Sequence, residues 1–173
     1  MSKRLFLQPD LVLGGIITDL TLEILQANQI EGLILDVDET LVPIHENAVT
    51  PELSRWVEEM RQVASIWLVS NNLSHNRIGD IARSLDLPYF LGARKPSRRK
   101  LLQAAMAMNL PVEKVAMVGD RLFTDVVAGN RLGMFTILVE PMVNPLIAER
   151  EYPIRNFEVW ISEILGVSMA TKK

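Results

Sequence analysis

The stretch that decides the fold is Gly32-Leu33-Ile34-Leu35-Asp36-Val37-Asp38-Glu39-Thr40, in which an apolar run leads directly into two aspartates. The run does not alternate polar with apolar residues, so it predicts a strand that is covered on both faces, as in a parallel sheet. Ligands of open parallel sheets bind beyond the carboxyl ends of the strands. The two carboxylates therefore stand where a ligand site is expected.

The rest of the chain repeats this pattern of short apolar runs separated by helical spacing. Runs at residues 66–69, 115–118 and 135–139 resemble the first, and residues 89–91 form a weaker fifth candidate. Segments with helical spacing lie around residues 19–28, 50–60, 74–85, 97–106, 124–131 and 157–165. Strands alternating with helices predict an α/β fold with a three-layer, doubly wound, Rossmann-like and mainly parallel sheet.

Capping residues set the expected helix ends. Thr50 followed by Pro51 is typical of a cap and first turn, and Ser74 can cap the next helix. Ser97 is expected to open the following helix, and Gly133 to stop the one at 124–131. The buried face of the 97–106 helix is expected to carry Leu101, Leu102, Ala105 and Met106.

Length and composition bound the class of protein. At 173 residues the chain is expected to form one domain, with an N-terminal extension and helix (1–30), a motif-bearing core (31–140) and a C-terminal loop and helix (141–173). No role is assigned to the irregular stretch 141–156. The absence of cysteine excludes disulfides, thiolate metal sites and a cysteine nucleophile. With a net charge of −3, no nucleic-acid partner is expected.

An apolar segment near the start, residues 11–17, raises the question of a membrane. It is far shorter than the ~20 residues that span a bilayer. We expect a cytoplasmic protein in which this segment packs on the core, and a peripheral membrane contact is the alternative.

Polar residues follow three of the predicted strands at the point where each strand ends. Asp36 and Asp38 follow the first run, Ser70 and Asn71 the second, and Asp120 the third. These side chains converge if the strands are neighbours. Clustered carboxylates repel one another unless a cation neutralises them, and oxygen ligands without cysteine favour Mg²⁺ over zinc. A magnesium site is therefore predicted at this edge.

In this order the motifs resemble those of the haloacid dehalogenase-like (HAD) superfamily. The first motif, DxDxT, matches Asp36, Asp38 and Thr40; the second matches Ser70; the third matches Lys95; the fourth matches Asp120 with Asp125. The chain is similar in particular to the YqeG-type branch of the capless subclass IIIA phosphatases, through residues 7–10, the 36–40 motif, Lys95-Pro96 and residues 119–125. Some relatives of that branch dephosphorylate phosphatidylglycerophosphate.

The resemblance implies a role for each matched residue. Asp36 would attack phosphorus and form an aspartyl-phosphate, and Asp38 would protonate the leaving oxygen and then activate water. Mg²⁺ would be held by Asp36, the backbone carbonyl of Asp38, and Asp120. The phosphoryl group would be contacted by Thr40, Ser70, Asn71 and Lys95. Asp125 would orient Lys95 or a water on the metal.

The spacing of the motifs indicates an open site. The intervals from Asp36 to Ser70 and from Ser70 to Lys95 are each filled by one predicted helix with its loops, which leaves no room for a cap domain. An open site suits a phosphate carried on a large group: a lipid in a membrane such as phosphatidylglycerophosphate, or another macromolecular phosphate on a protein or a nucleic-acid end. The alternative is a soluble sugar phosphate hydrolysed by a capless oligomer; the oligomeric state itself is not predicted.

A basic segment after Lys95 has two possible explanations. Arg98, Arg99 and Lys100 fall in the first turn of a predicted helix, where each basic charge opposes the helix dipole by ~0.3–1 kcal/mol. They indicate an anionic ligand or a phospholipid surface, and a solvated face explains them equally well.

A non-catalytic receiver-like or scaffold module could use the same sheet and Mg²⁺, but it would not need Asp38. No GxxxxGK[ST] motif occurs, which disfavours a P-loop protein.

Overall fold

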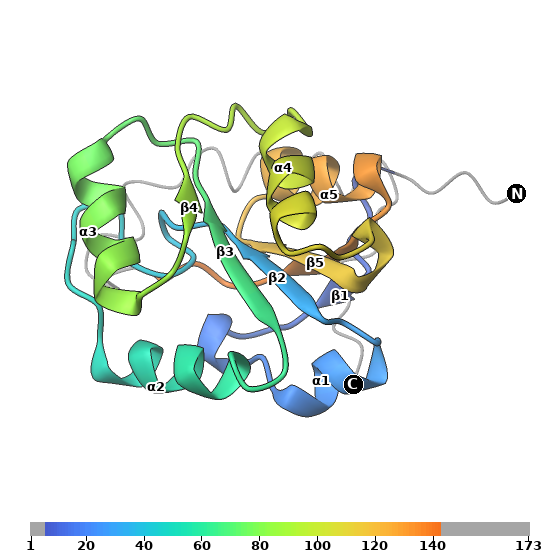
Figure 1. The fold of residues 1–173 in the computed structure, drawn as a ribbon, viewed down its shortest axis with the longest axis horizontal. Coiled ribbons are helices and arrows are strands. Elements are labelled where there is room, and N and C mark those ends of the chain that lie inside the picture. Colours follow the sequence, from blue (N-terminus) through green and yellow to red (C-terminus); the bar gives the residue numbers. More distant parts are fainter. Residues whose placement is uncertain (1–5, 143–173) are drawn as a thin grey trace, which may run out of the picture.

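A single parallel sheet organises residues 6–142, the part of the chain that the computed structural model describes (Figure 1). Its six strands lie in the order β1-β6-β5-β2-β3-β4, and every neighbouring pair is parallel. The strands are β1 (Leu11–Val12), β2 (Gly32–Leu35), β3 (Ser65–Val69), β4 (Tyr89–Phe90), β5 (Val115–Gly119) and β6 (Phe135–Leu138). The predicted doubly wound parallel sheet is confirmed, and β1 is an additional edge strand that the periodicity did not indicate.

Helices cover both faces of this sheet. They are α1 (Leu22–Ala27), α2 (Pro51–Met60), α3 (His75–Leu85), α4 (Arg99–Ala107) and α5 (Val127–Leu132), with short 3₁₀ turns η1 (Ile17–Asp19) and η2 (Val112–Lys114) and a π-helical turn η3 (Leu122–Val126). In Figure 1, α4 and α5 lie above the sheet and α1 and α2 lie below it. Among residues 6–142 none of the helices is both long enough and apolar enough to cross a bilayer.

The position of β2 inside the sheet, with helices on both faces, explains why its sequence is apolar throughout. Successive side chains of a strand point to opposite faces. Leu33 and Leu35 are fully buried in the core formed with α1, α2 and α3, whereas Ile34 is fully buried in the core formed with α4 and α5. Burying each such side chain contributes about 1.5–3 kcal/mol, so the continuous run is what a two-sided strand requires.

Two of the predicted caps are present. The Thr50 side-chain oxygen accepts a hydrogen bond from the Leu53 backbone N–H at 3.1 Å, with Pro51 at the first helical position. The Ser74 hydroxyl accepts one from the Arg77 backbone N–H at 3.4 Å. Such a contact satisfies one of the N–H groups that a helix leaves unpaired at its start.

Helix α4 differs from its prediction in start and in face. It begins at Arg99, with Arg98 rather than Ser97 as the residue before its first turn. Its buried side chains are those of Leu101, Ala104 and Ala105, and the prediction that Leu102 and Met106 share this face is wrong, since they are 42% and 70% exposed. Positions i, i+3 and i+4 lie on one helical face, whereas i+1 and i+5 turn away from it.

Two other predicted helices are divided into shorter elements. The 19–28 segment forms the end of η1 and then α1, and the 124–131 segment forms the end of η3 and then α5. Gly133 terminates α5 as predicted, with a φ of 81° that glycine adopts without strain. The predicted helix at 157–165 and all but the first two residues of 141–156 lie outside the described residues. The apolar run at 11–17 contributes β1, and Ile17 is fully buried in the core.

The strand order places a crevice between β2 and β5. From β2 the chain proceeds outward through β3 and β4, and then returns to β5 and β6 on the other side of β2. Leu35 pairs with Val118, and the backbone N–H of Asp36 donates to the Val118 carbonyl at 3.0 Å. The loops that follow β2 and β5 therefore diverge at neighbouring strand ends, which is where open α/β sheets bind their ligands.

Candidate active site

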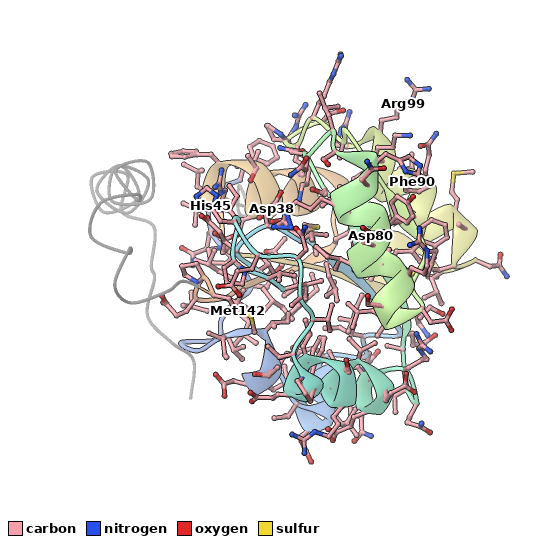
Figure 2. The ribbon with its side chains drawn as sticks, turned by 90° about the vertical axis from the view of Figure 1, so that its left-hand side faces the viewer. Asp38, His45, Asp80, Phe90, Arg99 and Met142 are labelled. Atoms are coloured by element: carbon pink, nitrogen blue, oxygen red, sulfur yellow. The ribbon has the colours of Figure 1, made fainter. Side chains whose placement is uncertain are left out.

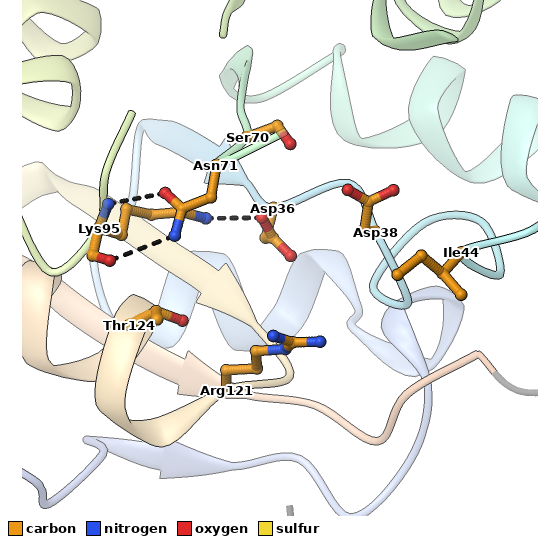
Figure 3. A pocket seen from close by; sticks show the side chains of 8 residues that line it. All are labelled: Asp36, Asp38, Ile44, Ser70, Asn71, Lys95, Arg121 and Thr124. Carbon is orange, nitrogen blue, oxygen red and sulfur yellow. Dashed lines mark hydrogen bonds and ion pairs between the residues drawn. The ribbon is translucent and has the colours of Figure 1, made fainter. Parts of the chain in front are cut away.

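Asp36 lies at the centre of a pocket at this crevice (Figure 3). It follows β2 directly and is buried. Its Oδ1 lies 2.6 Å from Lys95 Nζ, and its Oδ2 lies 3.5 Å from the Thr40 hydroxyl, which is the donor. The strand end and these contacts fix the carboxylate toward the pocket, as a nucleophile requires.

Lys95 is enclosed between two carboxylates. Its Nζ lies 2.6 Å from Asp36 and 2.7 Å from Asp125 Oδ1, and the residue is only 5% exposed. Burial lowers the pKa of Lys95, but the negative charges of Asp125 and Asp36 outweigh it, and the net result is a raised pKa. The lysine therefore stays cationic at the floor of the pocket.

Asn71 holds the backbone of that lysine. Its Oδ1 accepts the Lys95 N–H at 2.7 Å and its Nδ2 donates to the Lys95 carbonyl at 3.2 Å. Both ends of the amide are thus engaged, as the dashed lines in Figure 3 show. Asn71 was predicted to contact the phosphoryl group; it does line the pocket, but its side chain is directed to positioning Lys95.

Three buried carboxylates, that of Asp36 among them, lie close together. Oxygens of Asp36, Asp120 and Asp125 lie within 4.8 Å of one another. Burial, followed by the charges of Asp36 and Asp125, raises the pKa of Asp120 well above its usual value. Burial raises the pKa of Asp125 to about 6, although Lys95 opposes the shift. With Lys95 as one nearby cation, this donor set has a surplus of negative charge that fits a divalent ion with oxygen ligands.

Gly119 makes room for Asp125. A Cβ added at Gly119 would lie 2.2 Å from Asp125 Oδ2, so a larger residue cannot stand there without displacing the carboxylate. The same oxygen accepts the Arg121 backbone N–H at 3.2 Å. The pattern around Asp120 predicted a role for the aspartate, but nothing in it indicated this reason for a glycine at position 119.

Thr40 is turned away from the pocket. Its hydroxyl donates to Asp120 Oδ1 at 3.0 Å, the residue is fully buried, and it does not line the pocket. The chain turns back after Glu39, whose φ is +66°, and the Leu41 N–H bonds to the Val37 carbonyl. The predicted contact between Thr40 and phosphate does not fit this geometry, because the tight turn directs the hydroxyl beneath the carboxylates.

Asp38 lies at the opposite side of Asp36 from Lys95 in Figure 3 and lines the pocket. Its Oδ1 is 2.8 Å from Arg77 Nη2, and its Oδ2 accepts a hydrogen bond from Asn72 Nδ2 at 2.9 Å. Sequence reasoning missed both partners. Asn72 adjoins the Ser70-Asn71 pair, which is a usable signal, whereas nothing local marks Arg77.

The remaining pocket wall contains three residues that the four motifs did not indicate, Ile44, Arg121 and Thr124. The pocket has a volume of about 110 Å³ and is lined by Asp36, Asp38, Ile44, Ser70, Asn71, Lys95, Arg121 and Thr124. Ser70 is buried and its Oγ accepts the Asn72 N–H at 3.0 Å, so its own proton is free to be donated. Arg121 is partly exposed and contacts Glu39 at 3.1 Å, which places a second cation at the mouth.

The parallel sheet, the Asp-Val-Asp turn at its switch point and the buried lysine between two aspartates fit a phosphatase of the HAD superfamily, and the described segment from Asp36 to Lys95 holds no cap domain. Comparison of the sequence with known protein families identifies one family within this class. The chain belongs to the family described as mitochondrial PGP phosphatase, whose family model matches residues 1–144. The predicted superfamily and the YqeG-type branch are confirmed.

Individual proteins are similar to the chain in sequence or, for one solved structure, in fold. The chain is 37% identical over 145 residues to "Probable phosphatase YqeG" of Bacillus subtilis (strain 168), with 83% of each chain covered. It is 26% identical over 152 residues to the mitochondrial phosphatidylglycerophosphatase GEP4 of Saccharomyces cerevisiae, with 80% of each covered. The cobalt-bound deoxy-D-mannose-octulosonate 8-phosphate phosphatase (YrbI) of Haemophilus influenzae has a TM-score of 0.51 at 14% identity, with 80% of this chain and 91% of that chain covered.

Proposed function

We propose that this protein is a Mg²⁺-dependent phosphomonoester hydrolase that works through an aspartyl-phosphate on Asp36. The observation that carries the proposal is the placement of the Asp36 carboxylate in the pocket, 2.6 Å from a buried, cationic Lys95. A carboxylate in this position can attack phosphorus while the lysine stabilises the charge that the phosphoryl oxygens carry.

Two steps complete the reaction. In the first, an Asp36 oxygen forms a bond to phosphorus, the bond from phosphorus to the substrate oxygen breaks, and Asp38 gives its proton to that oxygen so that an alcohol leaves. In the second, Asp38 takes a proton from water, the water oxygen attacks phosphorus, and the bond to Asp36 breaks. Inorganic phosphate is released and Asp36 returns as a carboxylate. General acid–base assistance of this kind contributes ~10²–10⁴-fold.

The other pocket groups bind the phosphoryl oxygens. Lys95 stays charged, and the Ser70 hydroxyl can donate from the buried strand end. Arg121 supplies a further positive charge at the mouth. Because these groups are already held in place, they stabilise developing charge without reorganising, which is the largest catalytic contribution in many enzymes.

The carboxylate cluster would hold the metal. Asp36 and Asp120, together with the backbone carbonyl of Asp38, provide hard oxygen ligands, and we place Asp125 as the support of Lys95 because its Oδ1 contacts the lysine. A bound Mg²⁺ would neutralise charge between the carboxylates and an anionic substrate. The cobalt in the Haemophilus phosphatase of the same fold is consistent with a divalent ion.

For the substrate we propose a phosphomonoester on a membrane lipid, phosphatidylglycerophosphate. The description of the family and the name of GEP4 both point to it. The intervals that could contain a cap hold only α2, β3, α3 and β4 with their loops, so a lipid headgroup in a bilayer can approach the pocket.

A basic face beside the pocket supports a lipid surface. We use "basic face" for Arg94, Arg98, Arg99 and Lys100, which lie in or next to the loop that carries Lys95. No Asp or Glu occurs between Asp86 and Glu113. Leu73, which is 81% exposed, lines a hollow of about 610 Å³ together with Arg94, Arg99 and Lys100.

The position of this face is suitable for docking. A helix that follows a parallel strand begins at the strand's carboxyl end, so the start of α4 lies at the same edge as Asp36. Arg99 projects outward from the rim of the molecule (Figure 2). Each basic residue near an anionic bilayer contributes about 1 kcal/mol, so the face could hold the protein there reversibly.

One assay panel tests the proposal. The full chain is incubated with phosphatidylglycerophosphate in mixed micelles and, separately, with soluble sugar phosphates, each with Mg²⁺ and with excess chelator. Acid-quenched samples are examined by intact mass for one added phosphoryl group. We expect metal-dependent release of phosphate, a preference for the lipid and a transient adduct that Asp36→Asn lacks. An adduct that persists in Asp36→Asn would rule out this nucleophile, and a preference for sugar phosphates would rule out the lipid.

A further inference from the structure

Arg77 contacts both Asp38 and the loop that follows it. Its Nη2 lies 2.8 Å from Asp38 Oδ1 and 3.1 Å from the Pro43 carbonyl oxygen. Its Nη1 donates to the Glu46 carbonyl at 2.8 Å and to Asn47 Oδ1 at 3.3 Å. One guanidinium thus joins α3 to the loop that leads out of the Asp36–Thr40 turn.

The loop held by Arg77 is part of the pocket wall. Ile44, which lines the pocket, lies between Pro43 and Glu46, whose carbonyl oxygens both accept from Arg77. The second oxygen of Asp38 is bound by Asn72, whose own Oδ1 accepts the Ser74 N–H at 2.8 Å. The Asp38 carboxylate is therefore held from two directions, both anchored at the start of α3.

The position of Arg77 is not explained by helix stability. It lies in the first turn of α3, where a positive charge opposes the helix dipole by ~0.3–1 kcal/mol. Its side chain is only 12% exposed, so the guanidinium also gives up most of its hydration. The two terminal nitrogens offset part of this cost through three hydrogen bonds and the ion pair with Asp38 in a fixed fork that a lysine could not match, while Nε has no hydrogen-bond partner.

We propose that Arg77 is a positioning residue that holds Asp38 where it can deliver a proton to the leaving oxygen. The proposal rests on the proposed function, in which Asp38 is the general acid. Without Arg77, Asp38 keeps the Asn72 contact alone and the 43–47 loop loses three acceptor contacts. The carboxylate then samples other rotamers, and proton delivery slows because general acid catalysis requires hydrogen-bond geometry.

This role has a signature that a purely structural role lacks. A phenolate leaves readily without a proton, whereas an alkoxide does not. Loss of the positioned acid should therefore reduce kcat/KM for an alkyl phosphate much more than for an aryl phosphate. Damage to the pocket wall or to the phosphate contacts should reduce both values by the same factor.

The test compares kcat/KM for glycerol 3-phosphate with that for p-nitrophenyl phosphate, both soluble, so that membrane binding does not enter. For Arg77→Met we expect the ratio of alkyl to aryl values to fall by about tenfold or more, a part of the ~10²–10⁴-fold that general acids supply. Arg77→Lys, which keeps the charge and a single point of contact, should recover part of the ratio. Arg83→Met is the matched control, because Arg83 lies on the exposed face of the same helix, and its ratio should equal that of the wild type.

Asp38→Asn separates failure of this inference from failure of the proposed function. If Asp38→Asn leaves the ratio unchanged, Asp38 is not the acid and the proposed mechanism is wrong. If Asp38→Asn lowers the ratio but Arg77→Met lowers both substrates equally, the mechanism stands and the role of Arg77 is refuted. In the double variant, removal of Arg77 should change the ratio no further, since residues that act through one group are not additive. Should Arg77→Met not fold, Arg77→Lys alone carries the comparison.

Discussion

Lys95 Nζ lies 2.6 Å from Asp36 Oδ1 although the two residues are 59 positions apart in the chain. The contact joins the end of the central strand to the loop before α4, and Asp125 meets the same ammonium group from the turn after β5. Three strand-end segments are thus connected through one buried cation. Several consequences of this arrangement can be measured.

Replacement of Lys95 by methionine should slow every phosphomonoester. The change removes a preorganised cation from the phosphoryl site, and loss of one such group typically costs ~10²–10³-fold in rate. It also leaves Asp36 and Asp125 buried without their partner, which costs up to about 3–5 kcal/mol of stability. Kinetics and urea unfolding of the metal-free protein would measure the two effects. Lys114→Met, which removes the exposed pair with Glu31, should change neither value much.

Asp36→Asn should abolish turnover and preserve the fold, because an amide nearly matches the carboxylate in shape but is not a nucleophile. Asp38→Asn should be nearly as damaging, and phosphoenzyme should accumulate if hydrolysis of the intermediate suffers most. Rapid quench followed by mass spectrometry distinguishes the two variants. The control is Asp86→Asn, which changes an almost fully exposed side chain and should behave as the wild type. Full turnover by a folded Asp36→Asn protein would mean that the nucleophile is another residue.

Mg²⁺ should both activate and stabilise the protein. An ion that binds only the folded state adds about 2.7 kcal/mol when its concentration is 100 times Kd, so Tm should rise with Mg²⁺ and the rise should vanish with chelator. Asp120→Asn should weaken this response, because it removes one of the clustered carboxylates. Full phosphatase turnover in excess chelator would contradict the assignment of the metal.

Gly119→Ala should disturb the site through Asp125. The new methyl group would overlap the Asp125 carboxylate, and overpacking of this kind typically costs ~1–3 kcal/mol. Activity should fall because Lys95 loses a fixed partner. Gly32→Ala is a suitable control, since its methyl group would also be crowded but would meet side-chain atoms of Leu110, Met108 and Val115 at the other end of the strands, far from the pocket. Equal activity of the two variants would show that Asp125 does not need the space that Gly119 leaves.

Replacement of Arg98, Arg99 and Lys100 together by glutamine should weaken binding to anionic vesicles and slow hydrolysis of lipid phosphate. Hydrolysis of p-nitrophenyl phosphate should barely change, because these side chains do not line the catalytic pocket. The matched control replaces Arg55, Arg83 and Lys114 by glutamine, which removes the same charge from other surfaces. Unchanged vesicle binding by the first variant would mean that the basic face is simply solvated.

Much of the fold followed from patterns among near neighbours in the chain. Strand β2 was recognisable because a two-sided strand needs an unbroken apolar run, and the starts of α2 and α3 were recognisable because Thr50 and Ser74 cap their own helices. Such signals are local, so they survive without knowledge of the fold. The positions of Asp36, Asp38, Ser70 and Asp120 at strand ends were predicted for the same reason.

Only the tertiary structure decided what each of these side chains contacts. The turn after Glu39 directs Thr40 to Asp120 instead of the pocket, and the order β5-β2-β3 brings Asp120, Asp36 and Ser70 together. The contact between Arg77 and Asp38 depends on how α3 packs against the 43–47 loop, which lies some 30 positions earlier in the chain. Periodicity and capping encode where a helix or strand begins and ends and which of its side chains are buried. The partner of a charged side chain depends instead on strand order and on packing between elements that are remote in sequence.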